Sequence, residues 1–170
     1  EFRRVLSRAR AGYLPKESEP AGNETVLEIA VPNEHEHDGQ FVAKAKQILN
    51  SLGFKLTDYD RPAREMSGGW IMRAHLARLL AEEPDLLMLD EPFAGIDPIA
   101  VTDIQNIIFH LKERGIGVLI TDHNVRETLR ITDRAYIVHD GVIFRSGTPD
   151  FLAADEEVKR TYLGTAFRLD

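Results

Sequence analysis

The stretch that decides the fold is Leu86-Leu87-Met88-Leu89-Asp90-Glu91-Pro92. Its first four residues form a short, continuous apolar run, which predicts a strand buried on both faces of a parallel sheet. Such a strand delivers Asp90 and Glu91 at its C-terminal end, and Pro92 stops strand pairing directly after them. The rest of the chain is interpreted outward from this strand.

Two adjacent carboxylates at the end of a buried strand are typical of a nucleotide site. Neighbouring residues point in different directions, so Asp90 is expected to hold the water shell of a Mg²⁺ ion while Glu91 polarises an attacking water. The alternative interpretation is a strand end with solvated acids. The apolar run before the pair and the proline after it favour the nucleotide site.

Before this strand, Ser67-Gly68-Gly69 opens a helical pattern of apolar residues that ends at Pro84. A helix start offers backbone N–H groups and a positive dipole end to a phosphate, and glycines permit close approach. Serine and glycine are also ordinary capping residues, so this motif alone is a weak signal. Its position shortly before the acidic pair favours phosphate binding.

Two further candidates follow the acidic pair. Asp97 is expected to lie in a loop at the site, or to cap the helix that starts at Pro98, and both can hold together. His123 follows a predicted strand at 118–121, at the end where parallel sheets collect active groups. A lone histidine is usually structural, but this one comes one complete helix after the acidic pair. We therefore expect its imidazole to bond the terminal phosphate and the attacking water.

The remaining pattern alternates helices and strands, which indicates a layered α/β domain. Gly53 stands where the helix predicted at 40–52 needs a left-handed cap, and Asp140-Gly141 signals a hairpin. The other predicted elements are a strand at 12–14, a loop at 16–23, helices at 101–111, 124–131, 149–154 and 156–163, and a strand at 135–138.

The composition limits the kinds of partner and site that this chain can have. The 170 residues have room for one domain, and the formal charge of -7 argues against strong non-specific binding to nucleic acid or anionic lipid. The absence of cysteine excludes disulfides and thiolate metal sites. No apolar run approaches the roughly 20 residues that span a bilayer, so a membrane role is expected only through a partner. Two sets of residues are interpreted as solvated surface: Arg3, Arg4, Arg8, Arg10 and Lys16, and the histidines His35 and His37.

Together these motifs resemble the ATPase domain of ABC (ATP-binding cassette) proteins. The matching parts are the signature (Ser67, Gly68, Gly69), the Walker B aspartate (Asp90), the catalytic glutamate (Glu91), the D-loop (94–97, with Asp97) and the switch histidine (His123). The resemblance implies an α/β fold, a partial P-loop NTPase with a helical subdomain. It implies a signature subdomain at about 24–83, a core at about 84–147 and a helical tail at about 148–170. It also implies ATP and Mg²⁺ as cofactors, with Glu91 and His123 catalytic.

One essential part of that family is missing. No glycine-rich loop ending in Gly-Lys-Ser or Gly-Lys-Thr occurs, so the Walker A cradle for the β- and γ-phosphates is not in these residues. The sequence also starts at Glu1 rather than methionine, and Lys16 cannot accept a bond from a magnesium-bound water. We therefore expect an N-terminally truncated cassette that is inactive alone.

The resemblance has two components. Residues from about 93 onward resemble the ATPase subunit of the bacterial lipopolysaccharide exporter, chiefly at 93–98, 120–129 and 158–169. Residues about 11–92 resemble the ABC-F family of soluble twin-cassette ATPases of the ribosome, chiefly at 12–15, 25–28, 47–54 and 67–73. Both families agree within 87–92, so a chimeric join is predicted there.

The exporter resemblance implies an ATPase subunit that energises lipopolysaccharide export. Its partners would be a second ABC ATPase subunit, whose nucleotide the signature closes on, and transmembrane transporter subunits that hold it on the cytoplasmic side of the inner membrane. No direct nucleic-acid contact is expected. The alternatives are an ABC-F type ATPase on the ribosome and a non-hydrolysing signature donor. Glu91 and His123 act on nucleotide in the same subunit, which disfavours the donor.

Overall fold

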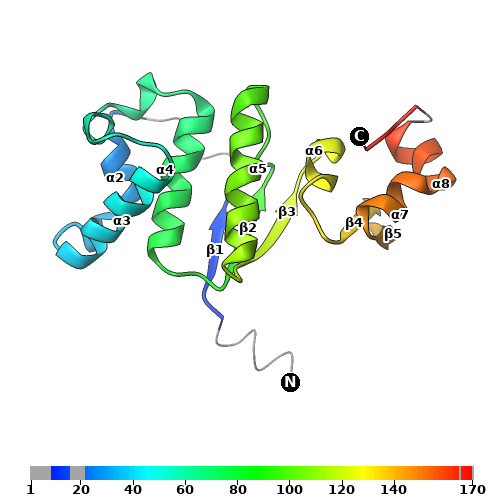
Figure 1. The fold of residues 1–170 in the computed structure, drawn as a ribbon, viewed down its shortest axis with the longest axis horizontal. Coiled ribbons are helices and arrows are strands. Elements are labelled where there is room, and N and C mark those ends of the chain that lie inside the picture. Colours follow the sequence, from blue (N-terminus) through cyan, green and yellow to red (C-terminus); the bar gives the residue numbers. More distant parts are fainter. Residues whose placement is uncertain (1–8, 16–21, 165, 170) are drawn as a thin grey trace. The chain divides into compact units, whose positions relative to one another are not determined.

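The computed structural model describes residues 9–15, 22–164 and 166–169 (Figure 1). Lys16, Arg3, Arg4 and Arg8 lie outside the described residues, so the interpretations placed on them stay predictions. The chain divides into two units, Glu1–Thr121 and Asp122–Asp170. The finer boundaries near 83 and 147 that the resemblance implies stay predictions.

A parallel sheet forms the centre of the first unit. Its strands are β1 (Ala11–Leu14), β2 (Leu86–Asp90) and β3 (Gly117–Thr121), in the order β1-β2-β3. β2 pairs along its whole length with β3, so that Asp90 lies opposite Thr121. The α/β fold and these strands are as predicted, and the acidic pair lies at the carboxyl edge of the middle strand.

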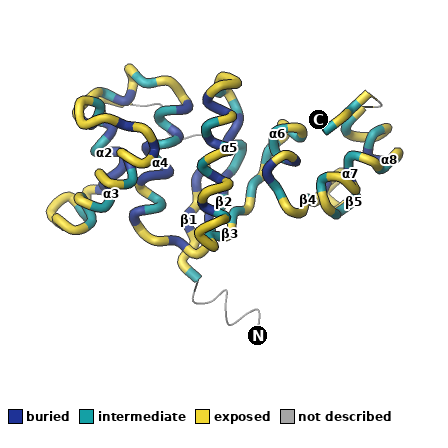
Figure 2. Tube along the Cα trace, viewed as in Figure 1, coloured by how far each residue is buried: buried dark blue, intermediate teal, exposed yellow. Residues whose placement is uncertain are grey.

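Helices α4 (Gly68–Ala81) and α5 (Pro98–Glu113) pack on one face of this sheet (Figure 1). Figure 2 shows buried and exposed residues alternating along α5, as expected of a helix with one core-facing side. In β2, Leu87 and Leu89 are buried while their neighbours are only partly so. On the other face, Tyr13 and Leu119 are each 54% exposed. The expected burial of β2 on both faces is therefore wrong for this chain, because no described element covers the second face.

A helical layer precedes β2 in the sequence. It contains α2 (Val26–Ala30), α3 (Gly39–Ser51) and three single 3₁₀ turns, η1 (Asn33–His35), η2 (Leu56–Asp58) and η3 (Ala63–Glu65). The helix predicted at 40–52 is confirmed as α3, and Gly53 follows it with φ +95°. α2 was not predicted. Thr25 caps it in a reciprocal box, since Glu28 N donates to the Thr25 hydroxyl and Thr25 N donates to the Glu28 carboxylate.

The second unit begins with α6 (Val125–Leu129) and a hairpin of β4 (Ala135–His139) and β5 (Val142–Gly147). Asp140 and Gly141 both have positive φ in the turn, as the Asp-Gly pair predicts. Three helical segments follow: α7 (Pro149–Ala154), α8 (Glu156–Val158) and a π turn, η4 (Lys159–Leu163). Leu129, Ile137, Leu152 and Val158 form a small core between them.

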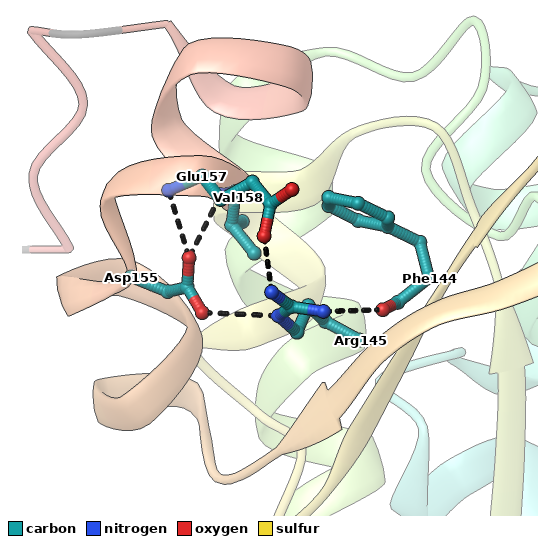
Figure 3. A network of polar contacts seen from close by, with 5 residues as sticks. All are labelled: Phe144, Arg145, Asp155, Glu157 and Val158. Atoms are coloured by element: carbon teal, nitrogen blue, oxygen red, sulfur yellow. Dashed lines mark hydrogen bonds and ion pairs between the residues drawn. The ribbon is translucent and has the colours of Figure 1, made fainter.

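Arg145 ties the hairpin of this unit to the helices that follow it (Figure 3). Its Nε donates to the Asp155 carboxylate at 3.2 Å, and its Nη2 pairs with Glu157. The other Asp155 oxygen accepts from the backbone N–H groups of Glu157 and Val158, at 2.8 and 3.0 Å. Asp155 is therefore both the N-cap of α8 and the partner of β5.

Among the residues that the structure describes, no helix is long and apolar enough to cross a bilayer.

Candidate functional site

The acidic pair is fixed to the end of β3. Asp90, the last residue of β2, accepts a hydrogen bond from the Thr121 hydroxyl. The backbone N–H of Glu91 donates to Thr121 O at 2.6 Å. The two acids thus share one anchor at the carboxyl edge of the sheet, the edge where α/β proteins bind ligands.

Glu91 adopts an uncommon backbone conformation. Its φ is +46°, a left-handed value that costs a residue with a side chain roughly 1 kcal/mol. Its Oε2 atom is shielded from solvent, and Pro92 and Phe93 beside it are buried. Asp90 ends an extended strand and Glu91 lies in a left-handed turn, so the two adjacent acids differ in backbone conformation.

The start of α4 is open to solvent. Ser67 is its N-cap residue, with φ −72° and ψ 159°, and the Ser67 hydroxyl makes no capping hydrogen bond within the described chain. Ser67 and Gly68 are exposed, whereas Gly69 is buried. The start of a 14-residue helix therefore exposes Gly68 together with the Ser67 hydroxyl, and a helix start of this kind can bind an anion.

The two glycines of this motif differ in what surrounds them. A Cβ on Gly69 would lie 2.6 Å from Ala100 Cβ, so Gly69 lets α4 approach α5 closely. A Cβ on Gly68 would meet nothing nearer than Gly95 O at 3.9 Å. Packing explains Gly69, and the open helix end leaves Gly68 available to a ligand.

Asp97 caps α5. Its Oδ1 accepts from the backbone N–H groups of Ile99 and Ala100, at 3.1 and 3.0 Å, and Pro98 occupies the first helical position. The capping interpretation is confirmed, and a role of Asp97 toward nucleotide stays a prediction. Because Gly69 contacts α5 at its start, the structure brings the Ser67 and Asp97 segments together.

His123 belongs to the second unit. Its side chain is 71% exposed, and its Nδ1 lies 3.9 Å from Asp122 Oδ1. Asp122 Oδ1 also accepts from Asn124 N at 2.7 Å, which shapes the turn that carries the histidine. The expected bonds of His123 to the terminal phosphate and the attacking water stay predictions that rest on sequence order.

The described residues fit part of a magnesium-nucleotide site. No group of three or more His, Asp or Glu side chains among them is arranged so that it could hold a metal ion. Mg²⁺ does not need such a cluster, since it usually keeps several waters and binds one or two carboxylates plus phosphate oxygens. Asp90, held by Thr121 at the sheet edge, is the carboxylate that fits this role, and the exposed start of α4 fits a phosphate.

Two residues of the site region were not predicted. The Thr121 hydroxyl on Asp90 follows from the register between β2 and β3, which the sequence does not give. Arg73 bridges α4 to Asp103 of α5, and nothing in the sequence pairs these two residues in advance.

A cavity of about 720 Å³ lies elsewhere in the first unit. It is lined by Ile48, Leu80 and Leu111, among others, in the C-terminal parts of α3, α4 and α5. None of the predicted site residues lines it, so it is separate from the candidate site.

Comparison with known proteins identifies similar chains. A sequence profile described as "ABC transporter" matches residues 3–94. A probable ABC transporter ATP-binding protein of Azorhizobium caulinodans is 46% identical over 171 residues, covering 96% of this chain and 59% of that protein. The lipopolysaccharide export system ATP-binding protein LptB of Haemophilus influenzae is 46% identical over 162 residues, covering 93% of this chain and 67% of that protein.

A crystal structure of an ATP-binding cassette of an ABC transporter, in its ADP conformation, matches with a TM-score of 0.77 and 29% identity. The match covers 91% of this chain and 68% of that one. The chain spans about three fifths of the length of the first of these relatives, the Azorhizobium protein.

Proposed function

The chain belongs to the family of ABC transporter ATP-binding domains, and on this premise we propose that it supplies the signature and hydrolytic parts of an ATPase that energises lipopolysaccharide export. The observation that carries the proposal is the acidic pair at the end of β2. The Asp90 carboxylate and the Glu91 backbone N–H are both anchored on Thr121, and Glu91 follows the strand in a left-handed turn.

Each site residue has a role in this proposal. Asp90 binds Mg²⁺ through its water shell, and the Thr121 hydroxyl orients the Asp90 carboxylate. Glu91 accepts a hydrogen bond from the attacking water. His123 bonds the terminal phosphate. When bound, Mg-ATP supplies the phosphoanhydride bond that is broken.

The start of α4 acts on a nucleotide held by a second ABC ATPase subunit. The Ser67 hydroxyl, the Gly68 N–H and the helix dipole are directed to its terminal phosphate, and Asp97 lies beside them. Family cassettes work as such pairs. The exposure of Ser67 and Gly68, together with the burial of Gly69, supports this division of roles.

The phosphate cradle must come from a polypeptide segment other than these 170 residues. Two features of the first unit support this. β3 pairs only with β2 among the described strands, so its outer edge is open, and Leu119 on β3 is 54% exposed. A further strand paired with β3 would close the open edge, and a helix over the exposed face of the sheet would cover Leu119.

The proposed substrate is lipopolysaccharide, with transmembrane subunits that hold the ATPase on the cytoplasmic side of the inner membrane. It rests on the similarity to the Haemophilus LptB and on the exporter-like residues 93–98 and 158–169. The Azorhizobium relative, named only as a probable ABC transporter ATP-binding protein, is equally identical, so the substrate requires a direct test.

The test is complementation. The complete reading frame that encodes this chain is expressed in a bacterium depleted of its own lipopolysaccharide-export ATPase. We expect growth to be restored by the unsubstituted protein and by Glu113→Gln, an exposed acid of α5, but not by Glu91→Gln, which keeps the shape and removes the base. Growth with Glu91→Gln, or no rescue together with co-sedimentation on ribosomes, would contradict the proposal.

A further inference from the structure

Arg73 joins three helices of the first unit through one side chain, which is only 11% exposed. It lies in α4, and its Nη2 donates to the carboxylate of Asp103 in α5. Its Nη1 donates to Leu52 O, at the C-terminal cap of α3, at 3.3 Å. The guanidinium also lies over the Trp70 ring, 4.5 Å from the centroid.

Each contact uses a different property of the guanidinium. The carbonyl at a helix C-terminus carries the negative end of the dipole, so a cation is favourable at Leu52. The indole face of Trp70 attracts the cation as well, and Phe54 holds that ring edge-on with centroids 4.9 Å apart. The planar fork of arginine holds its donors in fixed directions and so reaches the two acceptors in a defined geometry, which the rotatable ammonium of lysine does not impose.

Stability alone does not explain this buried cation. Its Nε is buried and has no hydrogen-bond partner in the described part of the chain, and the Asp103 side chain is 48% exposed. A buried cation with an incomplete set of bonds carries a desolvation cost that an apolar side chain would avoid. Arg73 fixes the position of α4 relative to α3 and α5, and this positioning explains its presence better than stability does.

The helices joined by Arg73 and Asp103 both start at predicted site residues. Arg73 follows Ser67 by six residues, and Asp103 follows Asp97 by six. The ion pair therefore lies about 9 Å along each helix from its N-cap, at about 1.5 Å per residue. The close contact of Gly69 with α5 lies one turn nearer to the helix starts, so two cross-links hold α4 and α5 in register.

We infer that Arg73 is a positioning residue: it fixes the N-terminus of α4 against that of α5, so that Ser67 and Asp97 meet the nucleotide as one rigid surface. Its effect on catalysis rests on the proposed function. The geometric part, the claim that Arg73 fixes the starts of α4 and α5 against each other, does not depend on that function and can be tested separately.

A spin-label distance tests the geometric part in the 170-residue chain. The chain has no cysteine, so Ser67→Cys and Ile99→Cys create a labelled pair at the two helix ends, and Ile99 is 78% exposed. We expect a narrow distance distribution that becomes about two-fold wider when Arg73→Met or Asp103→Asn is added, because the helix ends then sample several positions.

Lys44→Met is the matched control, because the described ion pair of Lys44 in α3 is with Glu83, just after α4, and not with a residue of α5. It should leave the distribution unchanged. An unchanged width in both Arg73→Met and Asp103→Asn would overturn the inference.

The catalytic part is tested in the complete reading frame. We expect Arg73→Met to lower kcat about ten-fold, with the Kd for ATP changed by less than about two-fold, because misplacing the signature leaves the nucleotide's own cradle intact. Arg73→Lys should recover part of kcat. A lower Tm with unchanged kcat would show a merely structural role and overturn this part. If the unsubstituted protein does not hydrolyse ATP, the proposed function fails, and the spin-label distance still decides the positioning claim.

Discussion

Gly68 and Gly69 are adjacent and lack side chains for different reasons. Gly69 lies against Ala100, and Gly68 faces open space at the start of α4. A sequence motif cannot separate these reasons, since both residues read as glycine at a helix start. The contact that separates them comes from α5, which follows β2 in the chain.

This difference predicts that the same substitution destabilises the chain at one glycine and has little effect at the other. Gly69→Ala must displace Ala100 and should destabilise the chain by about 1–3 kcal/mol, as overpacking does. Gly68→Ala meets no atom closer than 3.9 Å and should change stability by less than about 0.5 kcal/mol. Urea unfolding of the two variants measures both values. Equal stability of the two would contradict the close approach of α4 and α5.

The backbone of Glu91 also lay beyond sequence reasoning. Its left-handed φ is stabilised by the hydrogen bond to Thr121 O, which comes from the neighbouring strand. The chemistry of Asp90 and Glu91 is readable from the residues themselves, whereas the left-handed conformation of Glu91 depends on a tertiary contact.

Among the elements, the long periodic helices and the short helices of the second unit were predicted, whereas the short α2 was not. The spacing of apolar residues gave α3, α4 and α5, because each buries one continuous stripe. The five-residue α2 is too short to show a period. Its capping box, Thr25 with Glu28, was the available signal. The prediction that β2 is buried on both faces was wrong. An apolar run shows that a strand can be buried on both faces, but no described element covers the second face of β2.

Acid should loosen the Arg145 network of the second unit. The backbone N–H of Val158, and then that of Glu157 and the Arg145 side chain, hold the pKa of Asp155 below its ordinary value of 3.8. The stabilisation from this carboxylate is therefore fully present above that value and is lost as pH falls through the lower folded pKa.

Asp155→Asn should thus flatten part of the decline in stability below pH 4. Asp150→Asn, at an exposed acid in the first turn of α7, should leave the decline as it is. Thermal unfolding of both variants between pH 2 and 6 measures the difference. An unchanged acid profile in Asp155→Asn would mean that the network in Figure 3 contributes nothing to folding.

At the scale of the whole molecule, the chain carries the signature, the acidic pair and the switch histidine, and it carries them without the Gly-Lys-Ser/Thr cradle. The sheet of the first unit agrees with the absence of this cradle from the chain. One face is covered by α4 and α5, while Tyr13 and Leu119 on the other face remain exposed within the described residues. An incomplete cover of this kind agrees with the proposal that the phosphate cradle lies on another polypeptide segment.

The most direct test of this account is calorimetric titration of the purified 170-residue chain with Mg-ATP, followed by a phosphate-release assay on the same sample. The account predicts no saturable binding in the micromolar range and no hydrolysis above background. Stoichiometric micromolar binding, with phosphate release that Glu91→Gln abolishes, would contradict it.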